Sequence, residues 1–167
     1  MIISKSENGF IIENKEKNTI SFNTKEISDI NIFSFEKKDG KNVYFDQEGE
    51  YEAFGVEVTG YDLGENLNAG FVVKTDEKKV FLLDGKVSGF DEKILGKIDE
   101  IDVLLVNIPE NFNNIDLVKS ISEKISAKTI IFSGDREKIK QKFEKLENGD
   151  EKVKIGVNPE NTEFLFI

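Results

Sequence analysis

The sequence predicts an α/β fold, and two observations support this class. In the first half of the 167 residues, short apolar or alternating segments are separated by turns rich in Lys, Glu and Asn, as in successive β-strands. In the second half, segments with helical spacing alternate with continuous apolar runs in the order strand–helix–strand–helix–strand. This βαβαβ order gives right-handed crossovers in a partly parallel sheet. Two strand-rich sheets with helices from the second half are compatible with an αββα sandwich.

The strand-rich N-terminal half is expected to form a mostly antiparallel meander. Its predicted strands span residues 1–5, 9–13, 19–23, 29–35, 42–45, 51–61, 69–74 and 79–83. Residues 37–41, Lys-Lys-Asp-Gly-Lys, have the composition of a hairpin turn between two of these strands.

The βαβαβ half is predicted from the alternation of amphipathic and fully apolar segments. Helices are expected over 91–98, from a cap at Asn114 through Ile125, and over 135–146. Buried strands are expected over 102–108 and 128–133, and closing strands over 153–157 and 163–167. The expected core includes Ile32, Val58, Val72, Leu82, Leu104, Val106, Ile121, Ile131 and Phe143.

Length and composition favour a single domain over residues 1–167. The net charge of −10 and the single arginine, Arg136, argue against nucleic-acid binding, which needs clustered cations. The chain has no cysteine, which excludes disulfides and thiol catalysis and fits a cytoplasmic location. No apolar run approaches the roughly 20 residues that span a bilayer, so we expect no membrane partner.

One short segment carries a family resemblance. Residues 46–60 contain Gly49-Glu50-Tyr51-Glu52, which resembles the Gly-Pro-Gly-Glu-Tyr-Glu strand signature of the metallo-β-lactamase-fold hydrolases, in their lactonase-like, Zn-dependent branch. The order of the other predicted strands extends the resemblance from about Asp29 to the C-terminus. It implies a pared-down metallo-β-lactamase-like αββα sandwich.

The metal-binding positions that the resemblance implies are changed. In the family, a strand of the form Asp-Ile-Val-Thr-Val-Ser leads into His-x-His-x-Asp-His. Here residues 29–34, Asp-Ile-Asn-Ile-Phe-Ser, lead into Phe-Glu-Lys-Lys-Asp-Gly, so that of this motif only Asp39 matches. Asp84 resembles the family's bridging aspartate, and Gly134 stands where the resemblance places the last histidine.

The chain has neither histidine nor cysteine, so the usual zinc site of such hydrolases cannot be built. We therefore expect no cofactor, and a non-catalytic homologue that acts as a binding or assembly module. In this interpretation the Lys37 ammonium takes the place of the metal charge near Glu36, Asp39 or Asp84.

A rival interpretation keeps a metal. Asp39, Asp84 and Asp135, with Glu36 nearby, would meet at one sheet edge and bind Mg²⁺, Mn²⁺ or Ca²⁺ through oxygen ligands, giving a metal-dependent hydrolase. Each aspartate also has a local explanation. Asp39 and Asp84 precede glycines in turns, and Asp135 is placed to cap a helix.

The connection from Gly40 to the Glu50-Tyr51-Glu52 segment is shorter than the family resemblance implies, and this shortened metal-site side predicts self-association. It should leave strand edges and Phe side chains less covered than in a full-length fold. Because exposed edges are usually paired or protected, and symmetric dimers are common, we expect a homo-oligomer.

Overall fold

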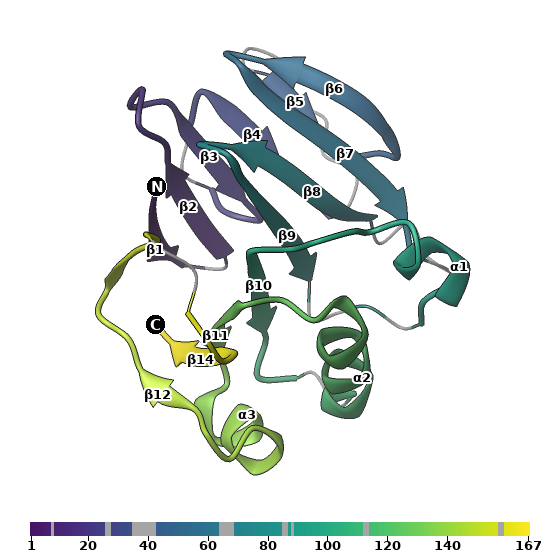
Figure 1. Cartoon of the computed structure of the whole chain (residues 1–167), viewed down its shortest axis with the longest axis vertical. Helices are drawn as coiled ribbons and strands as arrows, with labels where there is room; N and C mark the ends of the chain where they lie inside the picture. Colours follow the sequence, from purple (N-terminus) through teal and green to yellow (C-terminus); the bar gives the residue numbers. More distant parts are fainter. Residues whose placement is uncertain are drawn as a thin grey trace.

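The computed structural model describes residues 1–7, 9–25, 28–34, 43–63, 69–84, 87, 89–111, 114–156 and 159–167. Two β-sheets pack face to face, and the helices gather beside one of them (Figure 1). The predicted pared-down sandwich of two sheets is thus confirmed. In the described part of the chain, all three helices pack on one sheet, so the sandwich there has a single helical layer.

The six-stranded sheet has the order β13-β1-β2-β3-β4-β5. Its strands are β1 (Ile2–Ser6), β2 (Gly9–Glu13), β3 (Thr19–Phe22), β4 (Ile30–Ile32), β5 (Val43–Phe45) and β13 (Lys152–Lys154). The pairs involving β1 and the β2–β3 pair are antiparallel, whereas β3–β4 and β4–β5 are parallel. Residues 37–41, where a hairpin turn was predicted, lie outside the described residues. The strands on either side, β4 and β5, pair in parallel, whereas the two strands of a tight hairpin are antiparallel.

The eight-stranded sheet has the order β12-β14-β11-β10-β9-β8-β7-β6. Its strands are β6 (Gly49–Ala53), β7 (Val56–Asp62), β8 (Ala69–Thr75), β9 (Lys78–Asp84), β10 (Val103–Ile108), β11 (Thr129–Gly134), β12 (Glu147–Asn148) and β14 (Glu163–Phe166). The run from β6 to β9 is antiparallel, and the pairs from β9 through β10, β11 and β14 to β12 are parallel.

The strand predicted over 51–61 is two strands. They are joined by a two-residue turn, Phe54-Gly55, in which both residues have positive φ, 53° and 70°. Such turns usually carry Asn or Asp before the glycine. Phe54 in that place hid the turn from the sequence pattern.

The helices are α1 (Glu92–Leu95), α2 (Ile115–Ile125) and α3 (Arg136–Lys142). Asp91 and Asp135 cap α1 and α3 by accepting hydrogen bonds from backbone N–H groups two and three residues later. Asn114 occupies the N-cap position of α2, but its side chain makes no capping hydrogen bond. The helix predicted to reach residue 146 ends at Lys142, because Phe143 leaves helical geometry with φ −119° and ψ 82°.

The core has two parts. The first lies between the sheets and includes Ile32, Val58, Leu82 and Ile131, and the second lies between the eight-stranded sheet and the helices. The other predicted core residues, Leu104, Val106, Ile121 and Phe143, belong to the second part. Val72 is the exception, since it is half-buried and lines an open groove of about 280 Å³ on the outer face of β7 and β8. None of the described helices has the length and apolarity to cross a membrane.

Asp102 links the starts of β9, β10 and β11, at the amino-terminal ends of these parallel strands. Its side chain is 14% exposed and lies 3.4 Å from Lys78 Nζ and 3.8 Å from Lys128 Nζ. Its carboxylate accepts a hydrogen bond of 3.0 Å from the Lys79 backbone N–H, and its own backbone carbonyl accepts one of 3.0 Å from Thr129. The carboxylate therefore compensates two ammonium groups and binds the start of β9, while the backbone carbonyl of the same residue binds the start of β11.

We predict that Asp102→Ala lowers the free energy of unfolding by about 1–3 kcal/mol, because a largely buried N–H and two lysines lose their acceptor. Asp102→Asn should lose less, since its amide oxygen still accepts from Lys79. Urea denaturation measures both, with the exposed Asp150→Ala as a control expected to stay within about 0.5 kcal/mol of the native protein. Equal urea midpoints for Asp102→Ala and the native protein would contradict the prediction.

Candidate functional site

Three polar residues lie in one row at the carboxyl ends of the parallel strands. Asp84 of β9 pairs with Asn107 of β10, which pairs with Ser133 of β11. Paired residues project from the same face of a sheet, and residues two positions earlier on each strand belong to the core between the sheets. The row therefore faces the six-stranded sheet at one end of the sandwich. The carboxyl edge of parallel strands is the usual place for ligands in open α/β sheets.

Asp84 is bound by two residues of the opposite sheet. Its side chain is buried, with the residue 4% exposed, and Oδ2 accepts hydrogen bonds from Ser34 Oγ at 2.6 Å and Asn23 Nδ2 at 2.9 Å. Ser34 follows β4, and Asn23 follows β3 with a φ of 52°. Asn23 also donates to Ser34 Oγ at 2.8 Å and accepts from the Ser34 backbone N–H at 2.9 Å. These mutual hydrogen bonds hold the three side chains as one unit across the two sheets.

The other two residues of the row also contact each other. Ser133, 1% exposed, donates a hydrogen bond of 3.0 Å to Asn107 Oδ1. The buried end of the sandwich therefore contains hydroxyl and carboxamide groups beside one carboxylate. A site of this composition can bind polar ligands by hydrogen bonding, but its neutral members are weak metal ligands.

The two predicted site residues that the structure describes, Asp84 and Asp135, have different roles. Asp84 is the centre of the network. Asp135 caps α3, accepts from the Lys138 backbone N–H at 3.2 Å and lies 3.5 Å from Lys138 Nζ, so its predicted capping role is confirmed. Glu36, Lys37 and Asp39 lie outside the described residues.

Ser34 connects the described site to the segment in which the resemblance places the histidine motif. It is the last described residue before that segment, and its hydroxyl contacts Asp84. Two of the segments that the resemblance assigned to one site, the end of the 29–34 strand and the Asp84 turn, do meet. Asp84 was a candidate from the start, whereas Asn23, Asn107 and Ser133 were not. Each of these three is a polar residue at the end of an apolar strand segment, and this shared sequence pattern could have identified them.

Residues from the signature motifs that lie outside the row have structural roles. Hydrogen bonds from the Thr19 backbone N–H, at 2.7 Å, and the Thr19 hydroxyl, at 2.9 Å, hold the pKa of Asp29 below its usual value. Burial, aided by the nearby carboxylate of Asp46, raises the pKa of Tyr51. The Tyr51 ring stacks on Phe45 with centroids 4.5 Å apart, so this residue packs the edge of the sandwich.

The described donor groups do not fit a zinc ion. Zinc sites use thiolate, imidazole and carboxylate ligands, and the sequence has neither of the first two. Within the described ranges, no three Asp or Glu side chains gather to hold a metal. Gly134 has a φ of 100°, and a Cβ there would lie 1.9 Å from the Ile108 carbonyl oxygen. A histidine side chain therefore has no room at this position with the observed backbone.

Comparisons with known proteins bear on the fold. In sequence, the chain matches neither a model of a protein family nor a curated protein. In structure, it is similar to a Thermotoga maritima protein assigned to the Zn-dependent hydrolases of the metallo-beta-lactamase superfamily, with a TM-score of 0.78 and 18% identity over 99% of this chain and 97% of that one. The chain has the metallo-beta-lactamase fold. The resemblance first seen at β6 is thereby confirmed at the level of the fold.

Two further structures are similar to the chain at lower TM-scores, and one of them is described as a metallo-beta-lactamase fold protein. The fold protein YhfI from Bacillus subtilis has a TM-score of 0.58 and 7% identity, over 98% of this chain and 95% of that one. A diphosphatase of the PhnP family has a TM-score of 0.55 and 12% identity, over 77% of this chain and 75% of that one. At these identities the likeness establishes the fold alone, and the chemistry depends on the residues described above.

We predict that Asp84→Ala lowers the free energy of unfolding by about 2–4 kcal/mol, because the Ser34 hydroxyl and the Asn23 amide lose a shared acceptor inside the sandwich. Millimolar Mg²⁺, Mn²⁺ or Ca²⁺ should leave the melting temperatures of the native protein and of Asp84→Asn unchanged, since a bound ligand would add stability. Thermal unfolding with and without each ion measures this. A rise in the native protein that is lost in Asp84→Asn would support a cation site.

We predict that Gly134→His does not create a metal ligand and instead lowers the free energy of unfolding by about 2–4 kcal/mol, through backbone strain and overpacking against Ile108. Gly156→His is the matched control, because nothing lies within 4 Å of a Cβ built there. Urea denaturation with and without zinc measures both. Native-like stability of Gly134→His would show that the backbone adapts to a side chain.

Proposed function

We propose that this protein is a non-catalytic relative of the metallo-beta-lactamase-fold hydrolases and serves as a binding or assembly module. One observation carries the proposal. The buried carboxylate of Asp84, which by the resemblance corresponds to the family's bridging aspartate, accepts hydrogen bonds from the hydroxyl of Ser34 and the carboxamide of Asn23. A carboxylate used in this way joins the two sheets, which is a structural role.

The chemistry available to the chain supports the same proposal. A metal-bound hydroxide needs several protein ligands and one open position on the ion. The absence of histidine and cysteine removes the usual zinc ligands as well as the Ser-His and Cys-His arrangements that activate a nucleophile. The absence of cysteine also fits a reducing compartment, so we place this function in the cytoplasm.

A metal-dependent hydrolase with a carboxylate-only site is the second candidate. The contact between Ser34 and Asp84 favours it, because Glu36 and Asp39 follow Ser34 closely in the sequence. Oxygen ligands of this kind suit Mg²⁺, Mn²⁺ or Ca²⁺.

We predict that the purified protein contains no stoichiometric zinc at neutral pH and hydrolyses neither phosphodiesters nor lactones when Mn²⁺ or Mg²⁺ is added. Elemental analysis and hydrolysis assays measure these two properties. Stoichiometric zinc would overturn the proposal. Hydrolysis that depends on Mn²⁺ or Mg²⁺, and that is lost in Asp84→Asn, would establish the second candidate.

A further inference from the structure

Two edge strands of the sandwich carry opposite charges. β6 is the last strand of the eight-stranded sheet, and β13 is the last strand of the six-stranded sheet. Glu50 and Glu52 are exposed on β6 and form the acidic edge, and Lys152 and Lys154 are exposed on β13 and form the basic edge. In the part of the chain that the structure describes, none of these four side chains makes an ion pair or a hydrogen bond.

The charges beside the two edges are already paired. Glu57, which lies opposite Glu52 on the neighbouring strand, is 2.9 Å from Lys74. Glu13 on β2, two strands away from β13, is 2.6 Å from Lys17. These neighbours therefore leave the charges of the acidic edge and of the basic edge uncompensated.

The backbone groups of the acidic edge point away from the sheet. The two-residue turn after β6 is flanked by Ala53 and Val56, and such a turn is closed by a hydrogen-bonded pair. Hydrogen-bonded and non-hydrogen-bonded pairs alternate along antiparallel strands. Glu52 and Glu50 are thus at non-hydrogen-bonded positions, and their N–H and C=O groups are directed to the free edge.

The same alternation applies to the basic edge. The Ile155 backbone N–H donates a hydrogen bond of 3.0 Å to the Met1 carbonyl oxygen, one position beyond the pair of Ile2 with Lys154. Lys154 and Lys152 are therefore at non-hydrogen-bonded positions with respect to β1, and their N–H and C=O groups are also directed outward. Both edges present free backbone donors and acceptors at the residues that carry the charges.

The inner sides of the two edge strands are apolar. Tyr51 and Ala53 of β6, and Val153 of β13, pack against the core between the sheets. Because side chains alternate along a strand, the acidic edge and the basic edge both project from the outer faces of their sheets. If the two strands were paired, apolar residues would meet on the inner side and opposite charges on the outer side.

Neither edge suits a second copy of itself. Two β6 strands paired antiparallel about Tyr51 would place Glu50 opposite Glu52, and two β13 strands paired about Val153 would place Lys152 opposite Lys154. Like charges directly opposite each other are destabilising, whereas opposite charges stabilise a strand pair. The charge pattern thus opposes both symmetric pairings and favours an acidic edge against a basic edge.

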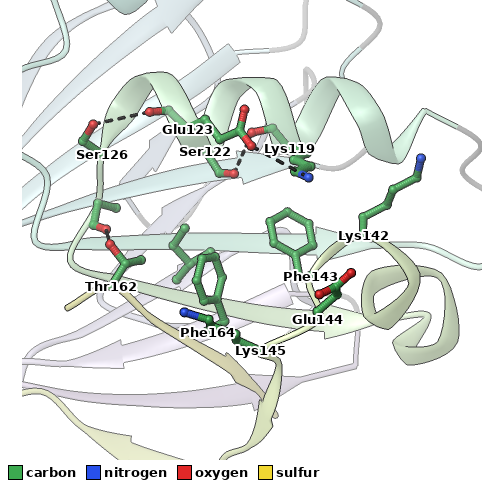
Figure 2. Close-up of a pocket in the computed structure, with 12 residues that line it drawn as sticks. Lys119, Ser122, Glu123, Ser126, Lys142, Phe143, Glu144, Lys145, Thr162 and Phe164 are labelled. Carbon is green, nitrogen blue, oxygen red and sulfur yellow. Dashed lines mark hydrogen bonds and ion pairs between the residues drawn. The ribbon is translucent and has the colours of Figure 1, made fainter.

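The groove of about 580 Å³ between α2, the end of α3 and β14 differs from these edges, because its polar groups are matched within the chain. Lys119 lies 3.9 Å from Glu123, and Lys142 lies 2.6 Å from Asp116. The groove's hydroxyl groups donate hydrogen bonds to backbone carbonyls; they belong to Ser122, Ser126 and Thr162 (Figure 2). The charges and backbone groups that call for a partner are those of the strand edges.

We propose that β6 of one copy of the chain pairs antiparallel with β13 of a second copy. The register places Glu50, Tyr51 and Glu52 opposite Lys154, Val153 and Lys152, in that order. Each Glu–Lys pair then exchanges two backbone hydrogen bonds. Within one molecule, β6 and β1, the neighbour of β13, lie on opposite sides (Figure 1), so the contact forms between copies. Two different surfaces meet head to tail, and such contacts build rings or open chains.

Charge reversal at each edge tests the pairing. Glu50→Lys with Glu52→Lys makes both edges basic, and Lys152→Glu with Lys154→Glu makes both acidic. These side chains are exposed, so the fold is retained. In sedimentation-velocity experiments at high protein concentration and low salt, the native protein assembles. Each variant raises the dissociation constant about tenfold or more, because every Glu–Lys pair becomes a pair of like charges.

The chain with all four substitutions is the decisive variant. It exchanges the charges of the two edges and keeps the net charge of −10, so it assembles like the native protein. Two control variants make the same changes in charge at exposed sites away from both edges, and they assemble like the native protein. They are Glu16→Lys with Glu144→Lys, and Lys93→Glu with Lys140→Glu.

A proline tests the backbone part of the contact. Glu52→Pro removes an N–H group that its own sheet does not use, so the hairpin is retained, and the urea midpoint stays close to that of the native protein. The same substitution removes a hydrogen bond from the contact and weakens assembly about tenfold or more relative to Glu52→Gln, the matched control that is neutral and keeps the N–H group.

A native protein that stays monomeric overturns the inference. It is also overturned by native-like assembly of either charge-reversal variant, by a monomeric chain with all four substitutions, by loss of assembly in the control variants, or by equal assembly of Glu52→Pro and Glu52→Gln. The inference deepens the proposed assembly function and rests on it, but the two fail in different experiments. Zinc content or metal-dependent hydrolysis overturns the non-catalytic function, whereas sedimentation of the variants decides the contact.

Discussion

The burial of one carboxylate between two sheets is the constraint on which this site depends. Asp84 is removed from water, so its oxygen atoms need donors, and the donors come from Asn23 and Ser34 on the opposite sheet. The pairing fixes how the ends of β3 and β4 meet the carboxyl end of β9. Hydrogen bonds between these side chains connect the same strands across the two sheets.

The backbone at the same end of the sandwich leaves no room for a side chain at position 134. Gly134 adopts a φ of 100° directly against the Ile108 carbonyl, a conformation open to glycine and closed to a side chain that reaches for a metal. The apolar strands form the metallo-beta-lactamase fold, while the described polar row at one end of the sandwich consists of side chains that hydrogen-bond to one another or to the opposite sheet. The apolar core between the sheets and the polar row consist of different side chains, since Leu82, Leu105 and Ile131 of the core lie two positions before Asp84, Asn107 and Ser133 on the same strands.

Several elements were predictable because their cause is local. The apolar runs of β10 and β11 and the cap at Asp135 follow from neighbouring residues alone, and the structure contains all three. The β6–β7 turn was missed, because Phe54 replaces the residue that usually marks such a turn. Parallel pairing of β3, β4 and β5 was also missed, because strand direction depends on how distant segments assemble, and the local pattern does not encode it.

The sequence alone determined which chemistry is open to the chain. Without histidine or cysteine no arrangement of the backbone can supply imidazole or thiolate, so the usual zinc centre was excluded before any coordinates. The tertiary structure alone decided what Asp84 does, because its partners Asn23 and Ser34 lie 61 and 50 residues away in the sequence. It also decided that Phe54 stands exposed. Both outcomes depend on how the sheets pack, and packing brings together residues that no local pattern connects.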